Sequence, residues 1–211
     1  MELKKYPRTP HFPFSETKTS DDRVLDNTNH FKGKIVVVTE KMDGENSTIY
    51  KNYYHARSLD SKHREYHSWL LSYIKSFQFM IPETMRICGE YLYAKHSIAY
   101  NNLENYFQVF SIWDNDTCLD WENTKELCET FGITMVPELY YGVYDEEIIK
   151  KIAKDVVDKG GEGIVVRIAN SFKYEDFQNN IAKYVRPNHV QTDKHWSLQQ
   201  IETNKIKKDK S

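Results

Sequence analysis

The sequence has little cysteine and no long apolar run. Its 211 residues include only three cysteines, Cys88, Cys118 and Cys128, and none of them forms a CxxC pair. A disulfide framework or a zinc site is therefore not expected, and a reducing compartment, the cytoplasm, fits this cysteine usage better. No stretch approaches the length of a membrane span, so no membrane association is expected.

An excess of charge of either sign is also missing. The chain has 29 lysines and arginines against 31 aspartates and glutamates, a net charge of −2. This balance gives no global attraction to nucleic acid, so any basic surface must be local. Hydrophobic residues make up 39% and charged residues 28%, as in a soluble globular protein with a core.

The pattern of apolar and turn residues predicts one α+β domain with mainly antiparallel strands. Prolines in a polar segment predict an ordered but irregular lead-in over 1–33. Apolar residues at helical spacing predict helices at 62–79, 120–131 and 145–158, and His63 and His67 are expected on a solvated helix face. Clusters of β-branched and aromatic residues predict strands at 34–39, 46–50, 53–58, 85–92, 106–113, 162–168 and 180–185.

The segment TEKMDGEN, residues 39–46, raises the first functional question, because it follows the most apolar short run of the chain. A lysine at the end of a buried strand, here Lys41, is partly desolvated, which favours its neutral, nucleophilic form. A solvated lysine is the commoner outcome at a strand end. Asp43 and Gly44 are equally compatible with an ordinary turn.

Four further stretches place functional side chains at or within predicted strands. ICGEYLYAKHSIAY contains Glu90, GGEGIVVRI contains Glu162, IAKYVRP contains Lys183 and Arg186, and FQVFSIWD is an aromatic strand. A core strand has no need of charge at its ends. Two carboxylates, several cations and an aromatic face suit a nucleoside triphosphate with its metal ion.

In this order the motifs resemble those of the covalent nucleotidyltransferases, the KxDG superfamily of polynucleotide ligases and mRNA capping enzymes. The segment 41–44, KMDG, is similar to the KxDG motif, whose lysine takes up the nucleotide. The resemblance spans about 34–187. It implies a nucleotidyltransferase (ATP-grasp-like) domain at 34–190, built from antiparallel sheets with flanking helices. It also implies that Arg57 contacts the ribose and that Phe110 stacks on the base.

Within the superfamily the chain resembles the RNA ligase two-like group of the RNA ligase family. Glu40 precedes the lysine, where that group uses the residue to read adenine, and Asn46 matches an asparagine used in sealing. The lead-in looks like that of small RNA ligase-family proteins. Only 28 residues, 184–211, follow Lys183. That length is too short for the OB domain of DNA ligases and capping enzymes, so 191–211 is expected to form a short C-terminal helix and a basic tail.

One departure concerns the fifth motif, which usually reads KxK. Here the sequence is Lys183-Tyr184-Val185-Arg186, and Val185 offers no charge to a phosphate. Arg186 is the candidate replacement for the second lysine. Strand alternation argues against it unless the strand ends before Arg186.

The resemblance implies an ATP-dependent RNA ligase that works through a lysine–AMP intermediate, with Mg²⁺ or Mn²⁺. Its substrate would be RNA with 5′-phosphate and 3′-hydroxyl ends, and a monomer is expected. The implied catalytic residues are Lys41, Glu90, Glu162 and Lys183, with Glu90 and Glu162 at the metal. The implied nucleotide-binding residues are Glu40, Asp43, Asn46, Arg57, Phe110 and Arg186.

Two alternatives remain open from the sequence. One is another nucleotidyltransferase, such as a capping-type guanylyltransferase or a protein adenylyltransferase. The other is a non-catalytic domain that binds RNA ends. The presence of all four implied catalytic residues argues against the second alternative.

Overall fold

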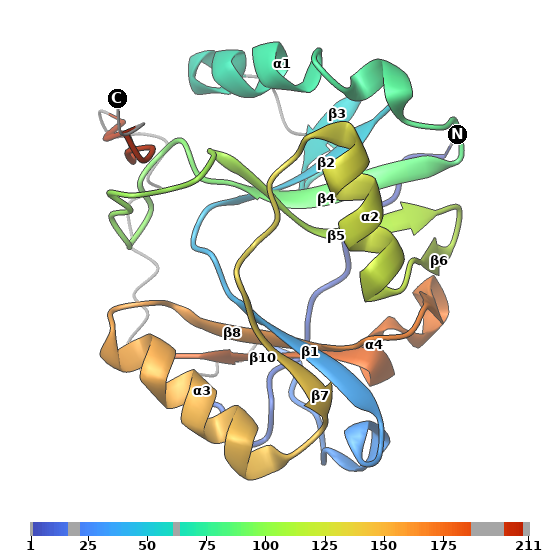
Figure 1. Cartoon of the computed structure of the whole chain (residues 1–211), viewed down its shortest axis with the longest axis vertical. Coiled ribbons are helices and arrows are strands. Elements are labelled where there is room, and N and C mark those ends of the chain that lie inside the picture. The colour runs from blue at the N-terminus through green and yellow to red at the C-terminus, as the bar shows by residue number, and fades with distance from the viewer. Residues whose placement is uncertain (1, 17–21, 61–63, 187–200, 209–211) are drawn as a thin grey trace.

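Two antiparallel β-sheets pack face to face in the computed structural model, which describes residues 2–16, 22–60, 64–186 and 201–208 (Figure 1). The predicted α+β fold of antiparallel sheets with flanking helices is confirmed. Sheet A has the strand order β10 (Ile181–Val185), β8 (Gly163–Ile168), β1 (Ile35–Glu40) and β7 (Glu138–Val143). Sheet B has the order β3 (Tyr54–Ala56), β2 (Glu45–Tyr50), β4 (Met85–Tyr91), β5 (Phe107–Asp114), β6 (Thr117–Cys118) and β9 (Phe172–Lys173).

Strand β1 lies inside sheet A, paired with β7 on one side and β8 on the other. Its apolar run Val36–Val38 is fully buried, because the faces of a covered strand both turn away from water. The edge strand β7 was not predicted from the sequence. Its residues alternate between exposed and half-buried, so it lacks the apolar signal of a core strand.

Helices cover the outer faces of both sheets (Figure 1). Helix α1 (Ser68–Ile74) packs Leu70 and Ile74 on sheet B, and α3 (Glu146–Asp158) packs Ile149 and Ala153 against sheet A. The remaining helical elements are α2 (Trp121–Phe131), α4 (Phe177–Asn180) and 3₁₀ turns at Asn29–Phe31, Glu65–His67, Gln78–Met80 and Tyr174–Asp176.

The predicted helix at 62–79 is wrong in its length. Only α1 is α-helical, with short 3₁₀ turns on either side. The solvated face expected for His67 is also wrong, because His67 is buried and its Nε2 lies 2.8 Å from Glu45 Oε1. His63 lies outside the described residues.

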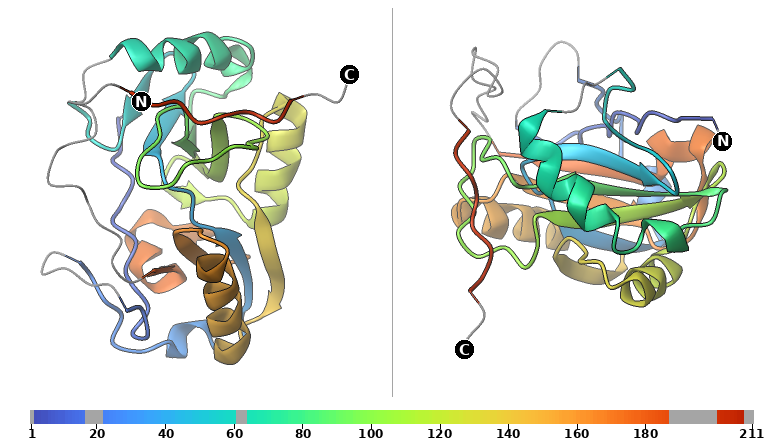
Figure 2. Two further views of the ribbon diagram at one scale, coloured as in Figure 1. Left: turned by 90° about the vertical axis from the view of Figure 1, so that its left-hand side faces the viewer. Right: turned by 90° about the horizontal axis from the view of Figure 1, so that it is seen from above.

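The N-terminal lead-in runs from sheet B to sheet A (Figure 2). At its start, the Lys4 backbone N–H donates to the Tyr50 hydroxyl at 2.9 Å. Further along, the Tyr6 ring meets the Phe110 ring edge-on at 5.0 Å between centroids. The Phe12 N–H then donates to the Lys183 carbonyl at 2.9 Å, which joins the lead-in to β10.

Near the C-terminus, residues 201–208 are extended rather than helical. The Asn204 N–H donates to the Tyr93 carbonyl at 2.9 Å, and the Leu103 N–H donates to the Lys205 carbonyl at 3.0 Å. The expected C-terminal helix is therefore wrong for these residues. The other residues of the segment 191–211 lie outside the described part of the chain.

Candidate active site

The segment Lys41–Gly44 connects the two sheets, because β1 of sheet A ends just before it and β2 of sheet B begins just after it. The Lys41 N–H donates to the Gly163 carbonyl at 2.9 Å, which fixes the start of the segment on β8. At Gly44 a Cβ atom would lie 2.5 Å from the Tyr91 carbonyl oxygen. Any side chain at this position would clash with the backbone of β4, so the position requires glycine.

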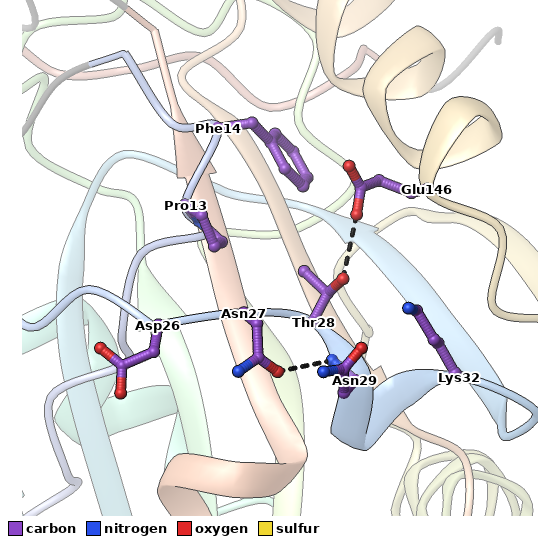
Figure 3. A pocket seen from close by; sticks show the side chains of 8 residues that line it. All are labelled: Pro13, Phe14, Asp26, Asn27, Thr28, Asn29, Lys32 and Glu146. Carbon is purple, nitrogen blue, oxygen red and sulfur yellow. Dashed lines mark hydrogen bonds between the residues drawn. The ribbon is translucent and has the colours of Figure 1, made fainter.

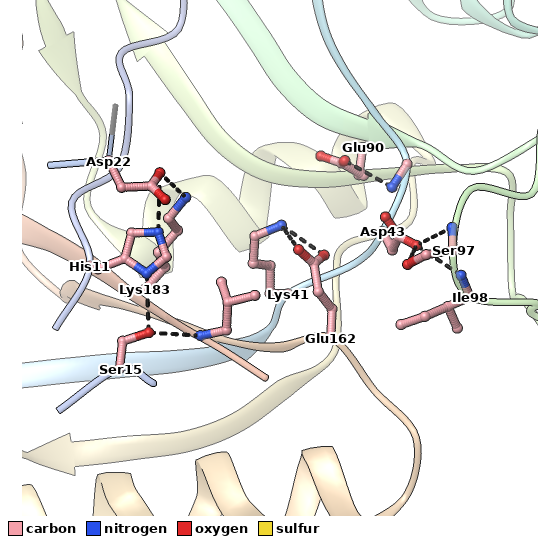
Figure 4. Close-up of polar contacts among 12 residues, drawn as sticks. His11, Ser15, Asp22, Lys41, Asp43, Glu90, Ser97, Ile98, Glu162 and Lys183 are labelled. Carbon is pink, nitrogen blue, oxygen red and sulfur yellow. Dashed lines mark hydrogen bonds and ion pairs between the residues drawn. The ribbon is translucent and has the colours of Figure 1, made fainter. Parts of the chain in front are cut away.

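The Lys41 ammonium faces the Glu162 carboxylate, with Nζ 2.7 Å from each carboxylate oxygen (Figure 4). The Lys41 side chain is 23% exposed and that of Glu162 5%. Burial acts to lower the pKa of Lys41, but the charges of Glu162 and Glu90 outweigh it and raise that pKa above its ordinary value. Lys41 is therefore held as a cation in this arrangement.

Glu90 is the second carboxyl group of the cluster, and its Oε1 accepts a hydrogen bond from the Gly44 N–H at 3.1 Å. Burial raises the pKa of Glu90 to about 8; the Lys41 charge opposes the rise and Glu162 adds to it. Glu90 is therefore largely protonated at neutral pH. A cation bound beside it would favour the ionised form.

Asp43 holds the loop that follows β4. Its Oδ2 accepts hydrogen bonds from the Ser97 N–H at 2.8 Å, the Ser97 hydroxyl at 2.7 Å and the Ile98 N–H at 2.9 Å. Burial acts to raise the pKa of Asp43, but these hydrogen bonds outweigh it and lower the pKa. The structure thus gives Asp43 an anchoring role in the loop, while its contact with a nucleotide stays a prediction.

Asn46, Glu90 and Gln108 form a row across strands β2, β4 and β5. Asn46 pairs with Glu90, and Glu90 pairs with Gln108, so all three side chains lie on one face of sheet B. Asn46 Oδ1 and Gln108 Oε1 are buried, and neither has a hydrogen-bond partner among the described residues. Two acceptor oxygens therefore flank Glu90, and a bound donor or cation would satisfy them.

Lys183 is the middle residue of β10, and Arg186 directly follows the strand. Burial, together with the charge of Lys41, lowers the pKa of Lys183. The strand ends at Val185, which is buried, so strand alternation does not direct the Arg186 side chain. The Arg186 N–H donates to the Glu162 carbonyl at 2.9 Å, and Arg186 lies at the cleft beside the cluster.

That cleft has a volume of about 730 Å³. Phe110 lies on the inner face of sheet B, half-buried, two residues beyond Gln108 on β5. Arg57 is exposed just after β3, where its charge interacts with those of Arg8 and Glu90. The residues that line the cleft are Glu40, Met42, Ser97, Ile98, Ala99, Tyr100, Asn101, Asn102, Leu103, Glu104, Gln108, Met135, Pro137, Lys159, Gly160, Gly161 and Arg186.

The structure thus brings Lys41, Glu162, Glu90 and Lys183 into one cluster. Glu40 and Arg186 line the adjoining cleft, Asn46 flanks Glu90 and Phe110 lies on the inner face of the sheet. Arg57 lies at the periphery.

Sequence reasoning missed three residues of the lead-in that reach this region. Tyr6 packs on Phe110, and His11 and Asp22 lie beside Lys183. Their contacts span from about 100 to more than 160 positions of sequence, so no local pattern signalled them.

A second hollow, of about 460 Å³, lies apart from this cluster (Figure 3). Its polar contacts are ordinary: the Thr28 hydroxyl donates to Glu146 at 2.9 Å, and the Asn29 N–H donates to Asn27 at 3.0 Å. Among the described residues, no buried polar atom that lacks a hydrogen-bond partner belongs to its lining. Its lining is Pro13, Phe14, Asp26, Asn27, Thr28, Asn29, Lys32 and Glu146.

Metal binding by the protein alone is not supported among the described residues, where no three histidine, cysteine or acidic side chains are grouped to hold an ion. The carboxyl groups of Glu90 and Glu162 beside Lys41 instead fit a metal ion that is bound together with a substrate. Mg²⁺ often uses one or two carboxylates together with substrate phosphates and water. Within the same described residues, no helix has the length and apolarity that crossing a membrane requires.

A family model described as RNA ligase matches residues 34–185, the range that contains both sheets and the Lys41 cluster. The chain belongs to the RNA ligase family. No curated protein matches the chain. The motif resemblance seen in the sequence is therefore confirmed at the level of the family.

Solved structures show the same fold as this RNA ligase family member. An archaeal ATP-dependent RNA ligase superposes with a TM-score of 0.61 at 16% identity, covering 87% of this chain and 48% of the other. A variant of Naegleria gruberi RNA ligase with ATP and manganese gives 0.54 at 19%, covering 75% and 51%. A putative ATP-dependent DNA ligase from Aquifex aeolicus gives 0.55 at 22%, covering 75% and 45%. The chain spans about half the length of these proteins.

Proposed function

We propose that this chain is an ATP-dependent RNA ligase that joins 5′-phosphate and 3′-hydroxyl RNA ends in the cytoplasm. The observation that supports this most directly is the Lys41 cluster. A lysine at the junction of two sheets faces a buried carboxylate at 2.7 Å, with a second carboxyl group and a second lysine beside it. This group of residues would suit nucleotide transfer to the lysine, and it lies inside the RNA ligase match.

The proposed first step makes a lysine–AMP adduct. The neutral amine of Lys41 attacks the α-phosphorus of ATP, so a P–N bond forms while the bond to pyrophosphate breaks and pyrophosphate leaves with the electron pair. Lys41 must first lose a proton, and Glu162 is within hydrogen-bond reach to accept it. An oxygen of the RNA 5′-phosphate then attacks the same phosphorus, so a P–O bond forms while the P–N bond breaks and the Lys41 amine is regenerated. Finally the 3′-hydroxyl attacks the activated 5′-phosphate, which forms the phosphodiester bond while the bond to AMP breaks; AMP leaves and the hydroxyl proton passes to solvent.

The other residues bind and orient the substrates in this proposal. Lys183 and Arg186 neutralise phosphate charge, and Phe110 stacks on the adenine. Glu40, which lines the cleft, reads the base, and Arg57 contacts the ribose.

Glu90 and Glu162 would hold a divalent cation together with the phosphates of ATP. The Naegleria gruberi neighbour contains manganese and ATP, which supports a divalent metal for this chain as well. The buried Asn46 Oδ1 beside Glu90 offers one more oxygen to the ion or to its water shell. When bound, the ion neutralises charge that develops on the phosphates.

A labelling experiment tests this proposal. The protein is incubated with ATP or GTP labelled at the α-phosphate and with Mg²⁺, then denatured. A labelled protein with ATP, lost in Lys41→Ala and kept in the exposed control Lys34→Ala, is the expected result. Labelling by GTP would favour a capping-type guanylyltransferase. Absence of labelling by either nucleotide would favour a domain that only binds RNA ends.

A further inference from the structure

The lead-in is built into the edge of sheet A next to Lys183. The Lys183 N–H donates to the Pro10 carbonyl at 2.9 Å, and the Phe12 N–H donates to the Lys183 carbonyl at 2.9 Å. His11, between these residues, is 2% exposed and forms bridges with both Val24 and Lys183. The imidazole therefore lies at a fixed place beside the lysine.

A hydrogen-bond chain orients the His11 ring (Figure 4). The Val185 N–H donates to Ser15 Oγ at 3.3 Å, and Ser15 Oγ lies 3.1 Å from His11 Nδ1. Because Ser15 Oγ accepts from Val185, its own proton is free to be donated to Nδ1. The neutral imidazole then carries its proton on Nε2, which lies 3.4 Å from Asp22 Oδ1.

The neutral form of His11 is favoured by its surroundings. Burial lowers the pKa of His11 to about 4, and the Lys183 charge acts in the same direction while Asp22 opposes it. At neutral pH the ring therefore adds no positive charge beside Lys183. Its Nε2 makes no hydrogen bond of good geometry among the described residues, and the Asp22 carboxylate, 3.4 Å away, is the acidic group beside it.

Asp22 stands between the two side chains. Its Oδ1 lies 4.0 Å from Lys183 Nζ, which is close enough for charge attraction and too long for a hydrogen bond. The Asp22 carboxylate can thus stabilise the positive charge of Lys183 while the N–H donors of the ammonium stay available for a phosphate. Lys183 needs such support, because burial and the charges of Lys41 and Arg57 all disfavour its cation, while Asp22 and Glu162 favour it.

We propose that His11 and Asp22 are positioning residues for Lys183: the His11 ring orients the Asp22 carboxylate, which holds the Lys183 ammonium charged and aimed at the nucleotide phosphate. The inference rests on the proposed function and extends it to the lead-in, which lies outside the matched range 34–185. Lysine has a long flexible side chain, and small errors of position in a reacting complex cost much rate. The lead-in is then part of the catalytic unit.

The test compares this role with simple packing of the lead-in. His11→Ala and Asp22→Asn are expected to slow adduct formation about tenfold to a hundredfold at saturating ATP. His11→Gln keeps an N–H donor at the Nε2 position and is expected to stay within about threefold of wild type. Asp26→Asn, an exposed aspartate of the same lead-in, is the matched control. Thermal unfolding of each variant reports whether the fold is kept.

A double-mutant cycle with Lys183 is the decisive measurement. If His11 and Asp22 act through Lys183, then adding Asp22→Asn to Lys183→Ala causes no further loss of rate, because the group that it serves is gone. Where Lys183→Ala leaves no measurable rate of adduct formation, the same cycle is measured on ATP affinity instead. Multiplicative losses, or equal losses in His11→Ala and His11→Gln, would overturn the inference. Absence of the adduct in the wild-type protein would overturn the proposed function itself.

Discussion

Replacing Glu90 with glutamine tests the electrostatics of the Lys41 cluster without changing its shape. The pKa of Glu90 rises from 4.5 to about 8 in the folded protein, so the folded state binds a proton that the unfolded chain releases between these values. The contribution of Glu90 to the free energy of unfolding is therefore fully present below pH 4.5 and is lost as pH rises toward 8. At pH 7, about 2.5 pH units above the unfolded value, this amounts to about 3 kcal/mol.

Glu90 is partly exposed, and solvent screens the effect. We therefore expect Glu90 to lower the free energy of unfolding at pH 7 by roughly 1–3 kcal/mol. Glutamine keeps an acceptor for the Gly44 N–H and does not titrate. Glu90→Gln should therefore be more stable than wild type by this amount at pH 7. The difference should shrink toward pH 5 and grow toward pH 8. The same variant should lose adduct formation, since it removes a proposed metal ligand.

Urea unfolding, followed by tryptophan fluorescence at several pH values from 5 to 8, measures the difference. Glu126→Gln, an exposed position on α2, is the control and should show no pH-dependent gain. A Glu90→Gln protein that is less stable than wild type, or more stable by the same amount at every pH, would refute the reasoning about buried charge.

Two further substitutions test the site, and a pair of glycine substitutions tests the backbone packing beside it. Glu162→Gln removes the carboxylate 2.7 Å from Lys41 and should cut adduct formation about a hundredfold or more, with no recovery at high magnesium; an unchanged rate would make Glu162 purely structural. Asn46→Ala should form the adduct with ATP but seal pre-adenylylated RNA about tenfold more slowly, and equal sealing would remove Asn46 from end positioning. Gly163→Ala should destabilise the fold by about 3 kcal/mol or more in urea unfolding, because its Cβ would lie 1.9 Å from the Tyr184 carbonyl oxygen. Gly33→Ala, with φ +73° and no atom within 4 Å of its Cβ, should cost only about 1 kcal/mol, so equal losses at the two glycines would contradict the clash.

The sequence predicted those parts of the molecule that local patterns encode. The apolar run of β1 and the aromatic run of β5 were found because their residues are buried inside a sheet. The helices predicted at 120–131 and 145–158 correspond to α2 and α3, because their apolar residues recur at helical spacing and each helix ends at or beside glycine. The residues of the Lys41 cluster were identified because each occurs in a motif of known order.

The rest depended on partners far away in the sequence. Strand β7 is recognisable only from its pairing with β1, since its own side chains are half exposed. His67 can be buried because its Nε2 lies 2.8 Å from Glu45 Oε1, and Glu45 lies 22 positions earlier. His11 reaches Lys183 only because the lead-in crosses from one sheet to the other. No local period encodes these contacts.

The strand order of sheet A also sets the time at which the site can form on a nascent chain. In sheet B, strands β3, β2, β4 and β5 are neighbours close in sequence, so these hairpins can pair as soon as residue 114 has been made. Strand β1 must wait for β7 and β8, more than 90 residues later, and β10 follows last. During translation, Lys41 is therefore present long before Glu162 and Lys183. In the proposed reaction, Lys41 can therefore take up the nucleotide only once β8 and β10 have been synthesised and paired with β1.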